Sequence, residues 1–181
     1  STGRGSECIL HPRNLIVAGA NSRVTIVETH VSLEETTYFS NAVAEIVLGE
    51  NACVEYDRLQ NESRRAFHVG ITHVHQARNS NFASNAFTFG GLLTRNNITA
   101  VIDGEGAECT LNGLYVATGD QLVDNHTAID HAKPRCNSHE LYKGILGGRS
   151  KGVFNGKIFV RKDAQKTDAR QTNKNLILSD N

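Results

Sequence analysis

The stretch Gly19-Ala20-Asn21-Ser22-Arg23-Val24 returns 30 residues later as Gly49-Glu50-Asn51-Ala52-Cys53-Val54, and a third version follows as Gly104-Glu105-Gly106-Ala107-Glu108-Cys109. All three have the form Gly-x-Asn/Gly-Ala/Ser-x-Val/Cys. Gly and Asn tolerate a positive φ, the small residue fits a tight corner, and the last residue enters the next strand. The motif therefore predicts a turn that recurs at one place in a repeating structure.

Short segments rich in β-branched or aromatic residues predict strands. They are residues 24–27, 43–48, 67–71, 98–102 and 157–160. No stripe of period 3.6 runs through a helix-sized window, and residues 138–142 are the one modest helix candidate. The pattern predicts an all-β protein.

The spacing of the turn motif favours a β-solenoid. The second and third copies lie 55 residues apart, a gap that two coils of about 27 residues would fill. Coils of ~20–30 residues give roughly six to nine coils, and stacking at ~4.8 Å per coil gives a rod of roughly 30–40 Å. The alternative fold is an antiparallel β-sandwich, with hairpin turns at Asp103-Gly104, Asn112-Gly113 or Asn155-Gly156.

The composition argues against several classes of protein. The 181 residues hold 19 Lys and Arg and 19 Asp and Glu, so the formal net charge is zero, and 39% of the residues are hydrophobic. Zero net charge argues against a general binder of nucleic acid or of anionic membranes, because both depend on an excess of basic residues. No apolar run approaches the ~20 residues of a membrane span. We expect one globular domain in the cytoplasm, with neither nucleic acid nor membrane as a partner.

The four cysteines, Cys8, Cys53, Cys109 and Cys136, contain no C-x-x-C pair. The zinc-ribbon, thioredoxin and ferredoxin motifs are therefore missing, and we expect mostly buried thiols in a reducing compartment. Cys53 and Cys109 are assigned to the strand-entry position of the turn motif, where the first copy has Val24. This predicts small packed hydrophobes, and no iron–sulfur cluster held by the four cysteines of one chain.

Two histidines at the end of a predicted strand are candidate metal ligands. His73 and His75 share the strand face of Phe67, Val69 and Ile71, whereas His68 lies on the opposite face. A third ligand would have to come from a neighbouring coil. We expect instead that the two histidines finish the strand near solvent or pack against neighbours.

Residues 124–139 are the densest stretch in metal-ligating side chains: Asp124, His126, Asp130, His131, Cys136 and His139. Imidazole and thiolate would suit iron or zinc, but the spacing is irregular, so a structured turn region is the favoured interpretation. If a metal binds at all, Cys136 and His131 are the candidates, because Pro134 between them restricts the chain. Further ligands would have to come from Asp130, His139 or a partner chain.

A Gly-rich, basic segment spans residues 144–152 and suggests a phosphate-binding loop. It lacks the G-x-x-x-x-G-K-[ST] pattern, and no helix pattern follows it. We therefore expect a tight turn between two strands.

The C-terminal third of the chain resembles a known family. The resemblance is carried by Cys136-Asn137-Ser138-His139-Glu140-Leu141-Tyr142-Lys143-Gly144-Ile145-Leu146, Gly152-Val153-Phe154-Asn155-Gly156-Lys157-Ile158, Asp163-Ala164-Gln165-Lys166-Thr167-Asp168-Ala169 and Gln171-Thr172-Asn173-Lys174-Asn175-Leu176. These segments closely resemble the SufB/SufD family, and most of all its SufD members. Less sharp similarity extends back to about His11.

This resemblance implies a right-handed parallel β-helix and a non-catalytic scaffold subunit in iron–sulfur cluster assembly. Its partners would be a SufB-like protein and a SufC-like ATPase, with a homodimer as a further possibility, in the cytoplasm or the plastid stroma. Residues 1–181 would form a single core domain, a fragment without the flanking helical regions of the family. No cofactor is expected on the chain alone, and an iron–sulfur cluster is expected only in the assembled complex.

Two further expectations concern the partner interface and a rival function. Residues 171–178 are predicted to form a last strand, whose apolar Leu176, Ile177 and Leu178 would pair with a partner chain. The rival function is a β-helix polysaccharide lyase or hydrolase. It would need clustered carboxylates together with a basic residue, and the sequence offers Asp103, Asp124 and Asp130 as acids.

Overall fold

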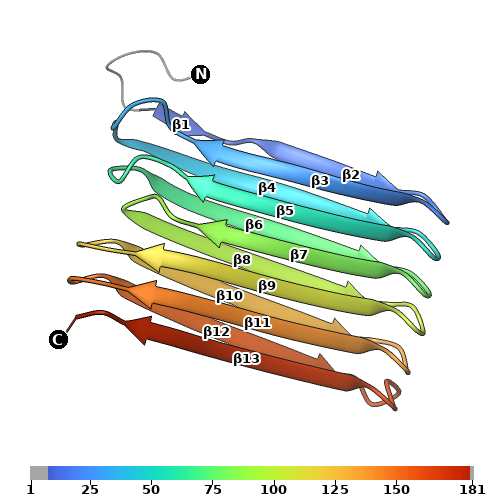
Figure 1. Cartoon of the computed structure of the whole chain (residues 1–181). Helices are drawn as coiled ribbons and strands as arrows, with labels where there is room; N and C mark the ends of the chain where they lie inside the picture. Colours follow the sequence, from blue (N-terminus) through green and yellow to red (C-terminus); the bar gives the residue numbers. More distant parts are fainter. Residues whose placement is uncertain (1–7, 180–181) are drawn as a thin grey trace.

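The computed structural model describes residues 8–179, and every regular element in them is a strand. We call the first sheet A; it contains β1 (Cys8–Leu10), β2 (Arg13–Ala18), β4 (Tyr38–Leu48), β6 (Phe67–Gln76), β8 (Leu93–Ile102), β10 (Leu122–His131) and β12 (Lys151–Val160). Sheet B contains β3 (Arg23–Val31), β5 (Cys53–Asn61), β7 (Asn81–Thr88), β9 (Glu108–Ala117), β11 (Asn137–Leu146) and β13 (Asp168–Ile177). The chain alternates between the two sheets and descends along one axis (Figure 1).

Each inner strand pairs in parallel with the strand one coil before and the strand one coil after it. The predicted β-solenoid is therefore confirmed, with about six coils. The antiparallel sandwich is wrong, since all pairings among residues 8–179 are parallel. Asn112-Gly113 and Asn155-Gly156 lie inside β9 and β12 rather than in hairpin turns.

The recurring turn motif forms the corner between sheet A and sheet B. One residue at each such corner has a positive φ: Asn21 (60°), Asn51 (58°), Asn79 (54°), Gly106 (74°), Arg135 (59°) and Lys166 (61°). Asn79 supplies the corner missing between the second and third copies of the motif. The amide of Asn51 donates to Asn21 Oδ1 at 3.0 Å, and that of Asn79 donates to Asn51 Oδ1 at 3.3 Å, so the asparagines form a ladder along the axis.

The core lies between the two sheets, because successive side chains of a strand point to opposite faces. In β10 the burial alternates through the whole strand. The largest buried apolar side chains are Ile46, Leu48, Phe82, Ile102, Leu111, Tyr115 and Ile129. The fold thus presents one interior and two outer sheet faces. No helix among the described residues is long and apolar enough to cross a membrane.

Three expectations about local structure fare differently. All five predicted strand segments lie within β3, β4, β6, β8 and β12. The helix candidate at residues 138–142 is wrong, since these residues belong to β11. Cys109 is buried as expected, but the register aligns Cys53 with Arg23, so Cys53 faces outward and is only partly buried. The strand-entry position in the second copy belongs to Val54, which aligns with Val24.

Candidate functional site

His73 and His75 lie on the outer face of sheet A and His68 lies inside, so they are on opposite faces of the strand, as predicted. The imidazole Nε2 of His75 is 3.5 Å from Asp103 Oδ2, and Lys133 Nζ approaches the other oxygen of that carboxylate at 3.7 Å. Both contacts are exposed, and an exposed ion pair such as Lys133 with Asp103 contributes little to stability.

The dense stretch 124–139 is divided between the outside and the inside of the solenoid. Asp124 faces outward and accepts a hydrogen bond from Arg95 at 2.9 Å, while His126 Nε2 lies 2.8 Å from its other oxygen. Asp130 faces outward and accepts hydrogen bonds from Nε and Nη2 of Arg161, at 3.0 and 2.6 Å. These acids, and Asp103, are thus each paired with neighbouring basic side chains.

His131 and Cys136 are both buried near one corner, but each already has a partner. His131 Nε2 lies 2.9 Å from Ser138 Oγ, and the thiol of Cys136 donates to the Gly104 carbonyl at 3.2 Å. Burial raises the pKa of Cys136 and lowers that of His131, so the thiol and the neutral imidazole are favoured.

The further ligands proposed for that metal do not converge on this corner. Asp130 faces outward from sheet A, and His139 is exposed on sheet B. Among residues 8–179, no group of three or more His, Cys, Asp or Glu is placed to hold a metal ion. Metal binding at Cys136 and His131 remains a prediction, and it would need ligands from a partner chain.

The Gly-rich segment forms a tight turn, as expected. Residues 147–150 connect β11 to β12, and Gly148 has a φ of 66°. The Arg149 guanidinium is bound by Asp120 through two hydrogen bonds of 2.7 and 2.8 Å, which occupy the basic group that would have met a phosphate.

A buried polar cluster lies inside the first coils, and the sequence did not reveal it. Glu62 is its centre: His68 Nδ1 is 2.7 Å from Glu62 Oε2, Gln60 donates to the same oxygen at 2.9 Å, and the Tyr38 hydroxyl donates to Oε1 at 2.9 Å. Burial acts to raise the pKa of Glu62, but these partners, His68 first, hold it below its ordinary value of 4.5. Only His68 of this cluster lies in a predicted strand, at residues 67–71, so the sequence carried almost no signal for it.

A second acidic group lies beside this cluster. Glu28 accepts a hydrogen bond from the Tyr56 hydroxyl, and His30 Nε2 is 3.4 Å from Glu28 Oε1. The hydrogen bond from His30 is the largest cause that lowers the pKa of Glu28 to about 2. The ring centroids of His30 and His68 are 4.9 Å apart, so the two groups form one network, buried around Glu62 and partly buried around Glu28. Both carboxylates are bound by neighbouring side chains of this network, which suits a structural role better than catalysis.

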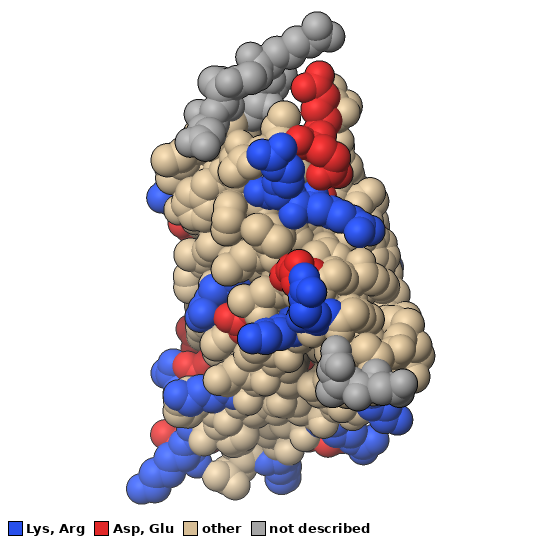
Figure 2. Space-filling view, turned by 90° about the vertical axis from the view of Figure 1, so that its left-hand side faces the viewer, with Lys and Arg blue, Asp and Glu red and all other residues tan. Residues whose placement is uncertain are grey.

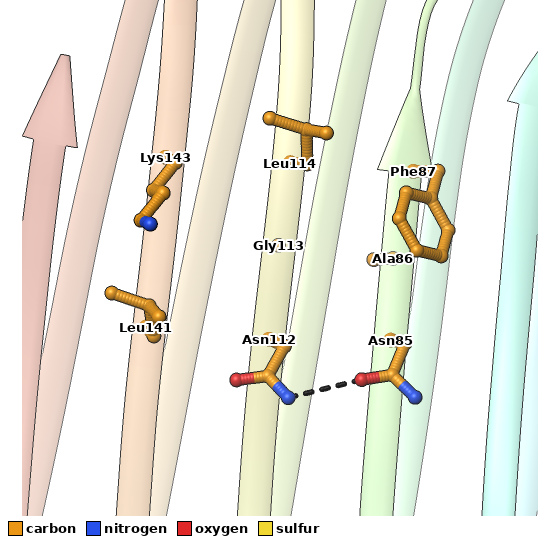
Figure 3. Close-up of a pocket in the computed structure, with 8 residues that line it drawn as sticks. All are labelled: Asn85, Ala86, Phe87, Asn112, Gly113, Leu114, Leu141 and Lys143. Atoms are coloured by element: carbon orange, nitrogen blue, oxygen red, sulfur yellow. Dashed lines mark hydrogen bonds between the residues drawn. The ribbon is translucent and has the colours of Figure 1, made fainter.

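The outer face of sheet B carries a small hollow (Figure 3). It has a volume of about 190 Å³ and lies over Ala86 and Gly113. The side chains of Phe87, Leu114, Leu141 and Lys143 stand around it, together with the amides of Asn85 and Asn112. No titratable pair or nucleophile lines the hollow, so its chemistry is that of an apolar contact with one cation at the rim.

The predicted partner-binding residues lie at the last strand. All ten residues of β13 are exposed, and Leu176, Ile177 and Leu178 are 56%, 61% and 64% exposed. On the other side of β13 its backbone pairs with β11. Among the described residues, β13 has no further strand neighbour.

Comparison with known proteins identifies relatives of this chain. The model of the SUF system FeS cluster assembly SufBD core domain matches residues 1–181. An iron–sulfur cluster assembly SufBD family protein of Synechocystis is 33% identical over 94% of the chain, and the iron–sulfur cluster assembly protein SufD of Escherichia coli is 30% identical over 93%. Protein ABCI7, chloroplastic, of Arabidopsis thaliana is 31% identical over 94%.

The chain covers only part of these relatives: 40% of the Synechocystis and Escherichia coli proteins and 36% of the Arabidopsis protein. The family match, in contrast, extends over all 181 residues. The parallel β-solenoid agrees with the fold that the sequence resemblance implied. The chain therefore belongs to the SufBD family of the SUF system for iron–sulfur cluster assembly.

Proposed function

We propose that this chain is a non-catalytic scaffold of the SUF assembly machinery, acting with a SufB-like and a SufC-like protein. Its similarity to SufD of Escherichia coli supports this role. The family match over residues 1–181 is the observation that carries the proposal. The compartment would be the cytoplasm, or the plastid stroma as suggested by the chloroplastic relative.

The edge of β13 suits pairing with a second chain. An edge strand presents backbone N–H and C=O groups that a strand from another molecule can satisfy. Three exposed apolar side chains in succession, Leu176, Ile177 and Leu178, would add buried apolar area to such a contact. A SufB-like chain is the proposed partner, and a second copy of this chain is the other outcome.

In this proposal, an iron–sulfur cluster is cargo of the assembled complex rather than a resident group of one chain. All four cysteines are free thiols, and Cys109 and Cys136 are buried. Burial raises the pKa of Cys109 to about 12, which disfavours the thiolate that a cluster needs. We expect anaerobic reconstitution of the chain alone to yield no stable four-thiolate cluster.

Co-purification with SufB-like and SufC-like proteins tests the scaffold role. The Ile177→Glu variant places a charge on the edge and should weaken association at least tenfold in sedimentation experiments. Val27→Glu is the matched control, because Val27 is 69% exposed on β3 at the other end of the solenoid. Unchanged association of Ile177→Glu would refute the assignment of the β13 edge as the partner-binding surface. Failure to capture either partner would refute the scaffold role.

Metal analysis of the complex and of the chain alone tests the assignment of Cys136 and His131. If these residues are ligands completed by a partner, Cys136→Ser and His131→Ala should each lower the metal content of the complex. Metal content that is indifferent to both substitutions would leave the two residues structural.

A further inference from the structure

A row of outward-facing side chains crosses sheet B along the solenoid axis. The register aligns, in order, Leu59 of β5, Phe87 of β7, Leu114 of β9, Lys143 of β11 and Lys174 of β13. The row is therefore apolar over three neighbouring strands and basic over the next two.

The hollow of Figure 3 lies beside this row. On its other side Asn112 donates to Asn85 at 3.0 Å, and Asn85 donates to Asp57 at 2.7 Å, so these polar side chains are bound to each other. This series of hydrogen-bonded polar side chains ends at Leu141, which is aligned with Asn112 on the next strand. Leu141 is 37% exposed and Phe87 is 38% exposed, so both offer apolar surface to a partner. At about 190 Å³ the hollow is smaller than typical small-molecule sites of ~300–1,000 Å³, and it suits one large apolar side chain.

The two lysines at the end of the row have no acidic partner. Lys143 and Lys174 form no ion pair with residues 8–179, whereas Arg149, Arg161 and Arg170 are each bound by an aspartate. Residues 143–174 hold nine Lys and Arg but only two Asp. Although the net charge of the chain is zero, the C-terminal end of the solenoid is therefore basic. Blue side chains predominate at the lower end of the molecule in Figure 2.

We infer that this row and its hollow form a docking surface for an amphipathic α-helix of a partner protein, with Asp or Glu near one end. One helical turn rises 5.4 Å, close to the ~4.8 Å between neighbouring strands, so a helix along the solenoid axis places one side chain per strand. Its apolar stripe would cover Leu59, Phe87 and Leu114 and send one side chain into the hollow. Its carboxylates would then reach Lys143 and Lys174.

The described residues of this chain contain no helix, so the test supplies the helix as a separate peptide. This surface lies on a sheet face rather than on the β13 edge. The inference therefore goes beyond the scaffold proposal and does not depend on it.

Fluorescence anisotropy with two labelled synthetic helices tests the inference. The acidic probe is an 18-residue peptide with Leu at every third or fourth position and Glu residues near one end. The second probe carries Lys in place of each Glu, and an unlabelled poly-Glu peptide serves as a competitor without apolar side chains. The 181-residue chain should bind the acidic probe in preference to the basic one and should not release it to poly-Glu.

Variants then locate the binding surface. Lys143→Glu/Lys174→Glu should weaken binding of the acidic probe about tenfold or more. Leu141→Asn, which fills the place after Asn112 with a polar side chain, should weaken it about fivefold. Lys151→Glu/Lys157→Glu changes net charge equally on the outer face of sheet A and should stay within about twofold of the parent, with circular dichroism confirming the fold of every variant.

Four results would overturn the inference. They are no binding of the acidic probe, equal binding of the two probes, a loss of affinity in Lys151→Glu/Lys157→Glu equal to that in Lys143→Glu/Lys174→Glu, and no effect of Leu141→Asn. A fifth result, displacement of the acidic probe by poly-Glu, would reduce the site to a charge effect and would refute the helical occupant.

Discussion

His68 Nδ1 lies 2.7 Å from Glu62 Oε2 in the interior of the solenoid, where both side chains are buried. Burial is the largest cause that lowers the pKa of His68 below 6.5, and the nearby carboxylate only partly opposes it. The folded protein therefore favours a neutral imidazole beside an ionised carboxylate. Both groups bind protons less readily in the folded state than in the unfolded chain.

We predict that acidification destabilises the protein in two steps. Because both folded pKa values are lowered, the stability that this pair contributes is complete above pH 6.5 and falls as pH decreases, first through His68 below 6.5 and then through Glu62 below 4.5. Glu62→Gln should lose ~2 kcal/mol at pH 7, because His68 and Gln60 lose a charged acceptor, and should show a flatter decline below pH 4.5. Urea unfolding from pH 7.5 to 3.5 measures both effects.

Glu45→Gln provides the control for this pH series. Glu45 is exposed on the outer face of β4, so its substitution should leave the shape of the curve unchanged. Parallel curves for Glu62→Gln and the parent would show that the buried pair has no part in acid sensitivity.

Glu140 on β11 gives a prediction of opposite sign. It is only 3% exposed, its carboxylate oxygens have no hydrogen-bond partner that meets geometric criteria, and burial raises its pKa despite the nearby Thr127 hydroxyl. The charged form therefore destabilises the fold at pH values above the raised pKa, and this penalty fades as the carboxyl protonates toward pH 4.5. Glu140→Gln should stabilise the protein by about 1–2 kcal/mol at pH 7.5 and by less at pH 5. A loss of stability at pH 7.5 would contradict this account.

The asparagine ladder predicts an order of stability at one corner. Asn51 has a φ of 58° and hydrogen bonds to Asn21 and Asn79. Asn51→Ala should cost ~2 kcal/mol, because alanine both loses these bonds and is strained at positive φ. Asn51→Gly loses the bonds without the strain and should cost ~1 kcal/mol. Equal melting temperatures of the two variants would show that the positive φ at residue 51 adds no cost for alanine.

The solenoid could be predicted from the sequence because its two main signals, apolar strands and turn residues, can each be read from short segments. Sheet A strands are rich in apolar residues, and four corners carry Asn or Gly at the residue of positive φ, three of which the sequence motif identified. The corners at Arg135 and Lys166 were not recognised, since these side chains rarely adopt that conformation. The polar strands of sheet B were mostly missed, because inward positions such as Gln60 and Glu140 break the apolar alternation.

The candidate site was harder to predict, because proximity in sequence is a poor guide in a β-helix. Asp130 and His131 are neighbours in the chain, yet one faces solvent and the other the core. The pairs that do meet, such as Glu28 with Tyr56, come from adjacent coils. Finding them from the sequence requires the register, which only the stacked corners fix.

Gly113 and Tyr142 supply the last prediction, because a Cβ at Gly113 would lie 2.2 Å from Tyr142 Cε1. The two residues are aligned neighbours on β9 and β11, and Tyr142 is buried against Phe154 with ring centroids 5.0 Å apart. Gly113→Ala should therefore cost ~2–3 kcal/mol through overpacking, whereas Gly147→Ala is the control, since its nearest neighbouring atom is 3.9 Å away. Combining Gly113→Ala with Tyr142→Leu should cost less than the two single changes together, because the smaller side chain removes the clash. If the losses in the free energy of unfolding, measured by chemical denaturation, were strictly additive, contact with the Tyr142 ring would not be the reason that residue 113 must be glycine.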